Sequence, residues 1–134
     1  MKTILAVLVG ILLGSLVNMG IVTLGGELVQ APKGVDVTDM ESLASSMHLF
    51  EPRHYLFPFL AHALGTLVGA FVAGKVAATG LYRPSLFIGG FFLLGGIASS
   101  VILPAPAWFI TLDLVLAYIP MSWLGFWLSK KLTK

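Results

Sequence analysis

The sequence predicts an all-α integral membrane protein, a single domain of residues 1–134 in which four spanning helices form a bundle. Hydrophobic residues make up 57% of the chain and charged residues 10%, whereas an average soluble protein has about 25% charged residues. The mean hydropathy is +0.97. Because a water-soluble domain with so few charges could not cover its surface, we expect the lipid bilayer to surround the chain.

The composition also excludes several classes of function. The chain has no cysteine, which rules out disulfides, thiolate metal sites and thiol redox chemistry. The formal net charge is only +2 and no basic block is present, so we expect no nucleic-acid partner. The sequence also lacks the motifs of nucleotide-binding loops, zinc proteases, serine hydrolases and dinucleotide-binding folds. We therefore expect no cofactor.

The first predicted span, residues 3–24, is uncharged and long enough to cross about 30 Å of hydrocarbon. It begins like a signal peptide but continues without an Ala-x-Ala-like cleavage site, so we predict a retained helix. Gly10 and Gly14 form a face on which another helix can approach closely. Asn18 is the strongly polar residue of this span, and either an interhelical hydrogen bond or a ligand contact would explain it.

The outer loop, residues 25–52, is the one long connection, and it contains most of the carboxylates. Thr38, followed three residues later by Glu41, fits a capping box at the start of a short amphipathic helix over residues 41–50. The acidic residues do not follow the pattern of a calcium-binding loop. We therefore predict a loop of 25–30 residues with one short helix and a solvated acidic face.

The second span, residues 53–79, carries an unusual stripe for a helix in lipid. Four of its residues recur at intervals of four and so share one helical face: His54, Pro58, His62 and Thr66. The proline removes a backbone hydrogen bond, so we expect a bend there. Gly65 and Gly69 form a second small-residue face. We predict that this helix forms the wall of the site, and that the two glycine faces are candidate surfaces for a homo-oligomer.

The third span, residues 84–103, is apolar all round and is notched by paired glycines, whose low helix propensity must be offset by close packing. The fourth span, residues 107–129, contains Asp113 and Pro120. Tight turns join the second span to the third and the third to the fourth.

The distribution of basic residues predicts the orientation. Four spans place both termini on one side, and most basic residues fall there: Lys2, Lys75, Arg83, Lys130, Lys131 and Lys134. Lys33 and Arg53 fall on the other side. The positive-inside rule therefore places both termini in the cytoplasm and residues 25–52 outside, as in a multi-pass protein of the bacterial inner membrane. Tyr55 and Trp108 would lie in the outer aromatic belt.

Asn18, His62 and Asp113 lie at a similar predicted depth, about 9–13 Å from the outer ends of their helices. A carboxylate at that depth is costly unless it is paired, hydrated or protonated, and His62 is its best candidate partner. Such a pair would form a site or would simply pin two helices together. His54 and Thr66 complete the candidate layer. His54 and His62 lie about 12 Å apart along a helix, too far to bind one metal ion, so we expect no metal site.

Three functions fit this polar layer. An outward-facing vestibule would bind or transport a small molecule or ion, with a homo-oligomer enclosing any pathway. Alternatively, a membrane-embedded enzyme would act on a lipid-like substrate, with His62 as general acid–base and Asp113 orienting it. In the third case the chain is an accessory subunit of a larger membrane complex. The sequence leaves open whether the protein is an enzyme.

Several stretches resemble a known group of proteins, among them Asn18-Met-Gly, Gly34-Val-Asp-Val-Thr-Asp-Met-Glu-Ser-Leu, the segment from Leu49 to Leu67 and the segment from Leu112 to Gly125. They resemble small bacterial envelope proteins with four transmembrane helices. The resemblance covers nearly the whole chain, and it implies the architecture and the bacterial setting but no activity. The chain differs from the small multidrug exporters, which carry a glutamate inside the first helix, because its first glutamate is Glu27. It also lacks the signature of the small fluoride channels.

Overall fold

The computed structural model describes residues 1–78 and 80–132, and this part of the chain is all-α. Four of its helical segments are long and apolar enough to cross a membrane: Lys2–Leu28, Pro52–Ala77, Arg83–Ile102 and Ala107–Lys131. The prediction of an all-α bundle with four candidate spans is therefore confirmed. In order, the elements are α1 (Lys2–Leu28), α2 (Met40–Ser46), η1 (Met47–Leu49), η2 (Pro52–Tyr55), α3 (Leu56–Ala77), α4 (Arg83–Ile102), α5 (Ala107–Leu116) and α6 (Ile119–Lys131).

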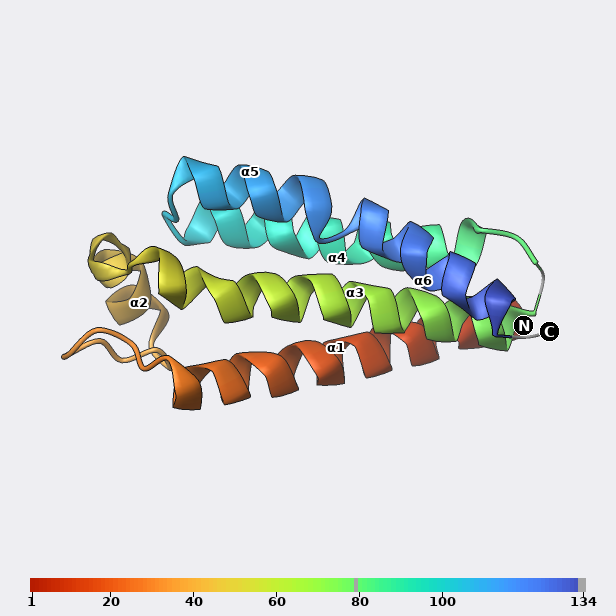
Figure 1. Cartoon of the computed structure of the whole chain (residues 1–134), viewed down its shortest axis with the longest axis horizontal. Helices are drawn as coiled ribbons and strands as arrows, with labels where there is room; N and C mark the ends of the chain where they lie inside the picture. Colours follow the sequence, from red (N-terminus) through yellow and green to blue (C-terminus); the bar gives the residue numbers. More distant parts are fainter. Residues whose placement is uncertain (79, 133–134) are drawn as a thin grey trace.

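The helix α3 occupies the centre of the bundle, with α1 on one side and α4, α5 and α6 on the other (Figure 1). The start of α1 and the end of α6 lie at one end of the bundle, and α2 lies at the opposite end. The α1 helix extends four residues beyond the predicted span, to Leu28. The predicted end of the second span, Thr79, lies outside the described residues, and α3 ends at Ala77.

The two glycine faces pack against each other within the chain. A Cβ atom on Gly10 would lie 2.7 Å from the carbonyl oxygen of Gly69, and one on Gly14 would lie 2.7 Å from that of Gly65. Both distances are shorter than carbon–oxygen contact, so α1 and α3 approach at backbone distance only because these residues lack side chains. In this structure the two faces are occupied by each other, and the homo-oligomer itself stays a prediction.

The inner half of the bundle, towards the chain termini, is closely packed, and several of its polar groups are paired. The Ser85 hydroxyl donates to the carbonyl oxygen of Ala70 at 2.7 Å, and the Tyr82 and Ser122 hydroxyls are hydrogen-bonded at 2.7 Å. The absent side chain of Gly125 leaves room for the α3 backbone at Leu67. These bonds join α3, α4 and α6, so the polar residues of this half act as packing elements.

The fourth span is broken, whereas the sequence predicted one helix over residues 107–129. The α5 helix ends at Leu116 and α6 begins at Ile119, with Pro120 in its first turn. Because proline has no N–H group and its ring clashes with the preceding turn, the hydrogen bond that would continue α5 to Leu116 cannot form. The two halves of the span therefore meet at a bend of two residues that belong to neither helix, and the second of these is Tyr118, with φ −117° and ψ −77°.

Pro58 also has a different role from the one predicted. The segment from Pro52 to Tyr55 is a 3₁₀ helix, and the α-helix begins at Leu56, so Pro58 is its third residue. A proline in the first turn of a helix removes no hydrogen bond that the helix would otherwise make. The change from 3₁₀ to α geometry at the start of α3 takes the place of the expected bend.

The outer loop contains the short helix that the sequence predicts, but its cap differs. Asp39, not Thr38, is the N-cap of α2, and its carboxylate accepts a hydrogen bond from the Ser42 backbone N–H at 3.1 Å. The Thr38 hydroxyl and N–H instead donate to Asp36 at 2.6 and 2.9 Å. These two bonds favour the ionised carboxylate and lower the pKa of Asp36 below its ordinary value.

Candidate functional site

A hydrogen-bonded histidine–aspartate pair links α3 to α5. His62 Nδ1 lies 2.8 Å from Asp113 Oδ1, and the Tyr118 hydroxyl donates to Asp113 Oδ2 at 2.9 Å. Because a carboxylate can only accept, Nδ1 carries the proton and donates it, which leaves Nε2 of a neutral ring as an acceptor. Asp113 is 4% exposed and has donors at both oxygens. The buried carboxylate is therefore satisfied without a third partner.

The break in the fourth span positions Tyr118. A residue five positions after Asp113 would point to a different face on a continuous helix. The bend at Tyr118 instead returns its hydroxyl to Asp113, and the tyrosine ring stacks on His62 with centroids 5.8 Å apart. On α4, Gly96 makes room for this tyrosine, because a Cβ atom there would overlap the phenol ring. Four helical elements thus meet at the pair.

An apolar cavity of about 260 Å³ lies between this pair and the outer loop. We call it the outer cavity. His62 and Asp113 form its polar end, and His54 and Tyr55 also line it. Its remaining walls are mostly apolar and come from the loop, α1, α4 and α5, including Leu43, Met47, Phe50, Leu103 and Phe109. A partly open apolar space of this kind, with few polar groups, is typical of a ligand pocket.

A second, more polar cavity of about 300 Å³ lies between α1 and α4, and we call it the polar crevice. It is lined by Ser15, Asn18, Met19, His62, Phe92, Gly95, Gly96, Ser99 and Tyr118. Three residues line both cavities: His62, Gly96 and Ser99. The histidine therefore lies where the two cavities meet.

Several polar groups of the crevice lack a hydrogen-bond partner within the described part of the chain, and two of them, Ser15 and Ser99, belong to exposed residues. Within residues 1–78 and 80–132, the side chains of Ser15, Asn18 and Ser99 make no hydrogen bond, and neither does Nε2 of His62. By contrast, Ser85 and Ser122 in the inner half each donate to a backbone carbonyl. An unpaired polar group at membrane depth costs free energy. The crevice is thus suited to polar atoms from water or a ligand.

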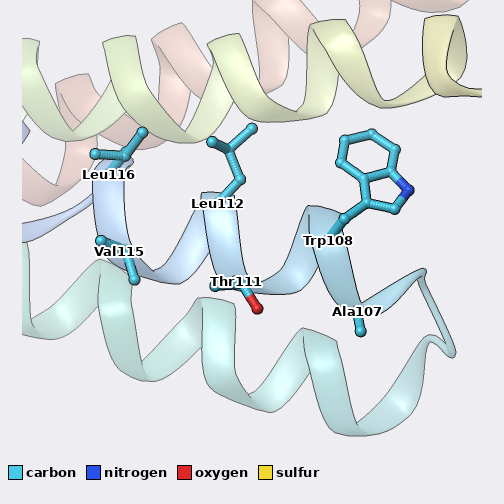
Figure 2. Close-up of a pocket in the computed structure, with 6 residues that line it drawn as sticks. All are labelled: Ala107, Trp108, Thr111, Leu112, Val115 and Leu116. Carbon is cyan, nitrogen blue, oxygen red and sulfur yellow. The ribbon is translucent and has the colours of Figure 1, made fainter.

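Figure 2 shows a further hollow, on one side of α5, with six labelled side chains. This shallow surface of about 500 Å³ is lined by Ala107, Trp108, Thr111, Leu112, Val115 and Leu116. It has no ionisable group and includes neither His62 nor Asp113. An apolar helix face of this kind suits contact with acyl chains, and we assign no chemistry to it.

The five residues of the predicted polar layer have different environments. His62 and Asp113 are in contact, and Asn18 lines the polar crevice with His62. Both ring nitrogens of His54 are engaged by the backbone: Nδ1 accepts from the Glu51 N–H at 2.8 Å, and Nε2 lies 3.2 Å from the Gln30 carbonyl oxygen. His54 therefore caps η2 and holds the loop, and only its ring surface faces the outer cavity.

Thr66 is 1% exposed, and its hydroxyl has no hydrogen-bond partner in the described part of the chain. It lines neither the outer cavity nor the polar crevice. Among residues 1–78 and 80–132, no three His, Asp or Glu side chains come together as a metal-binding group.

Sequence reasoning missed Tyr118, Ser15 and Ser99. Ser15 precedes Asn18 by three residues, so a search for polar residues on the same helical face would have found it. Tyr118 is placed by the break before Pro120, and the proline was the available signal. Ser99 lies on an apolar helix without any polar stripe, so no pattern identified it.

Comparisons with protein-family models, with curated proteins and with solved structures give no match for this chain. The resemblance to small bacterial envelope proteins therefore stays a prediction.

Proposed function

We propose that this protein binds a lipid-like small molecule in the outer half of its membrane domain. The polar head of the ligand would occupy the polar crevice, and its apolar chain would occupy the outer cavity. One observation carries this proposal: His62 lines both cavities and has one nitrogen held by Asp113 and the other unpaired. A single imidazole can therefore contact a ligand where its polar and apolar parts join.

The unpaired groups define the chemistry of the head group. Nε2 of neutral His62 accepts a hydrogen bond, so a ligand O–H or N–H group would donate to it. Asn18 both donates and accepts, and the hydroxyls of Ser15 and Ser99 do the same. An alcohol or an uncharged carboxylic acid would satisfy this set. A large charged head group would be unfavourable, because no Lys or Arg lines either cavity.

The membrane setting of the proposal rests on the distribution of charge. We propose that the chain lies in a bacterial cytoplasmic membrane with both termini in the cytoplasm, because the positive-inside rule favours that orientation. In the described ranges, Lys75 and the C-terminal end of α6 lie together, since Lys75 Nζ donates to the Leu132 carbonyl oxygen at 2.9 Å. The two cavities would then belong to the outer leaflet.

Binding is better supported than conduction. Neither cavity is lined by a residue deeper in the bundle than Ser15, Phe92 and Tyr118. Beyond them, the backbone contact between Gly10 and Gly69 closes the packing of α1 against α3. A transport pathway through the chain would therefore need a different conformation, or a partner copy that docks through a surface other than the glycine faces.

A membrane-embedded enzyme is the second candidate, and the Asp113–His62 geometry favours it. Asp113 holds His62 in one tautomer with Nε2 directed away from the carboxylate, which is the arrangement of a histidine general base and its orienting group. An ester-containing lipid with its carbonyl carbon near Nε2 would be a suitable substrate for water activated by His62. Release of fatty acid from a lipid extract by the wild type, but not by His62→Gln, would favour this candidate over simple binding.

The experiment that tests binding uses the methionine methyl groups as reporters. The chain has five methionines; Met19 lines the polar crevice and Met47 lines the outer cavity, whereas Met1, Met40 and Met121 line neither. With ¹³C-methyl methionine in lipid nanodiscs, a titration with 1-octanol should shift both cavity methyls saturably and leave the other three unchanged. Equal shifts at all five methyls, or none, would contradict the proposal.

A further inference from the structure

Tyr55 carries a buried hydroxyl group without a partner. The side chain is 4% exposed, and its oxygen makes no hydrogen bond within residues 1–78 and 80–132. The other two tyrosines of the chain differ, because the Tyr82 hydroxyl is paired with Ser122 and the Tyr118 hydroxyl donates to Asp113. A buried phenol normally finds a partner, since an unsatisfied one loses its hydrogen bonds to water without compensation.

The ring of Tyr55 is held in place by other aromatic rings. Its centroid lies 4.7 Å from that of Phe109, 5.7 Å from that of Trp108 and 6.3 Å from that of Phe50. These contacts would be kept by a phenylalanine. Ring packing alone therefore gives no reason for the hydroxyl of Tyr55, and its predicted depth in the outer aromatic belt stays a prediction.

Tyr55 lines the outer cavity together with His62. The two residues are seven positions apart along a nearly continuous helical segment, so they share one face and are separated by about 10 Å along its axis. Pro58 lies between them on the cavity wall and has no N–H group to offer. The wall of the cavity thus carries His62 at one level and, about two helical turns away, a tyrosine whose buried hydroxyl has no partner in the described part of the chain.

We infer that Tyr55 is a specificity-determining residue and that the ligand carries two oxygen-containing groups separated by an apolar segment. The inference rests on the proposed function. The first group, a hydroxyl or carboxylic acid, hydrogen-bonds to Nε2 of His62. The second is an acceptor oxygen (a carbonyl, ether or hydroxyl oxygen) to which the Tyr55 hydroxyl donates. The substrate class is therefore an amphiphile oxygenated at both ends of a medium-length apolar segment, and a simple hydrocarbon chain with one head group binds less well.

The test compares 1-octanol, which has one hydroxyl, with 1,8-octanediol, which has one at each end. Both are titrated into wild type, Tyr55→Phe and Tyr82→Phe in nanodiscs, with the Met19 and Met47 methyl signals as the readout. The measured quantity is the ratio of the two dissociation constants, because it cancels general effects on the cavity. Loss of one hydrogen bond should reduce the preference for the diol about five-fold in Tyr55→Phe. Tyr82→Phe removes a hydroxyl outside both cavities and should keep the wild-type ratio.

Three results would overturn the inference. An unchanged ratio in Tyr55→Phe, with 1-octanol still bound, would show that water rather than the ligand satisfies the hydroxyl, and the proposed function would stand. A fall in the unfolding midpoint of ligand-free Tyr55→Phe as large as that of Tyr82→Phe would show that the hydroxyl has a partner inside the protein. Failure of 1-octanol to shift Met19 or Met47 in the wild type would contradict the proposed function and this inference together.

Discussion

Asp113 of α5 and His62 of α3 share a hydrogen bond of 2.8 Å, and Asp113 uses its second oxygen to accept from Tyr118. The carboxylate therefore fixes two side chains at once. The imidazole is left with its free nitrogen where the outer cavity and the polar crevice meet. The same contact is both a tie between two helices and the basis of the proposed site, and substitutions can separate the two roles.

Asp113→Ala should be strongly destabilising, by about 3–5 kcal/mol, because it leaves His62 and Tyr118 without their buried acceptor. Asp113→Asn keeps the shape and one acceptor oxygen, so we expect a smaller loss of about 1–3 kcal/mol. Thr111→Ala, at an exposed position of the same helix, is the control and should change stability by less than about 0.5 kcal/mol. Unfolding in mixed micelles of increasing SDS content measures all three. Equal stability of Asp113→Ala and the control would rule out the buried pair.

Two adjacent glycines of α4 should respond in opposite ways to the same substitution. A Cβ atom on Gly96 would overlap the Tyr118 ring, so Gly96→Ala should cost at least about 1–3 kcal/mol and displace the tyrosine from Asp113. Nothing lies within 4 Å of a Cβ on Gly95, so Gly95→Ala should be neutral or slightly stabilising. Thermal unfolding monitored by circular dichroism gives the comparison. A neutral Gly96→Ala would show that Tyr118 does not pack on α4 as described.

The close approach of α1 and α3 predicts a second contrast. Gly14→Leu would place a side chain against the α3 backbone at Gly65, so we expect α1 to separate and stability to fall by more than about 2 kcal/mol. Gly20, on the same helix, has open space around it, and Gly20→Leu should fold normally. Protease protection of α1 in nanodiscs, with the unfolding midpoint, distinguishes the two variants. If both leave α1 equally protected, the backbone contact between the helices is wrong.

The proposed orientation can be tested by labelling single introduced cysteines, because the chain has no cysteine of its own. A single cysteine at Lys33→Cys should react with a membrane-impermeant maleimide in intact cells, since the outer loop faces away from the cytoplasm. Lys130→Cys, near the end of α6, should react only after the membrane is permeabilised. Labelling in the opposite order would invert the topology and move the two cavities to the inner leaflet.

Hydropathy and charge were sufficient to predict the architecture. The four apolar stretches bounded by charged or turn residues correspond to the four candidate spans of the structure. The positions of His62 and Asp113 along their helices placed both residues at the same predicted depth, and in the structure they are in contact. Both predictions depend on the energetic cost of placing polar groups in hydrocarbon, which varies little with the details of packing.

Features that depend on how helices pack were less predictable. Gly10 and Gly14 follow a spacing that suits contact within a chain as well as between chains, and only the structure shows that α3 occupies that face. His54 lies on the same stripe as His62, yet its two ring nitrogens are engaged by the backbone of Glu51 and of Gln30. Tyr118 reaches Asp113 through a break in the helix, which no periodic pattern describes.

The central claim is that a lipid-like ligand occupies the cavities that meet at His62, and native mass spectrometry in mild detergent tests it most directly. Gly95 lines the polar crevice, and nothing lies within 4 Å of its Cβ position, so Gly95→Leu would fill the crevice without disturbing the fold. Gly90 is equally open but lines neither cavity, and Gly90→Leu is the matched control. We predict one bound lipid-like molecule on the wild type and on Gly90→Leu, and none on Gly95→Leu. A wild type without a bound molecule, or equal occupancy in all three proteins, would contradict the claim.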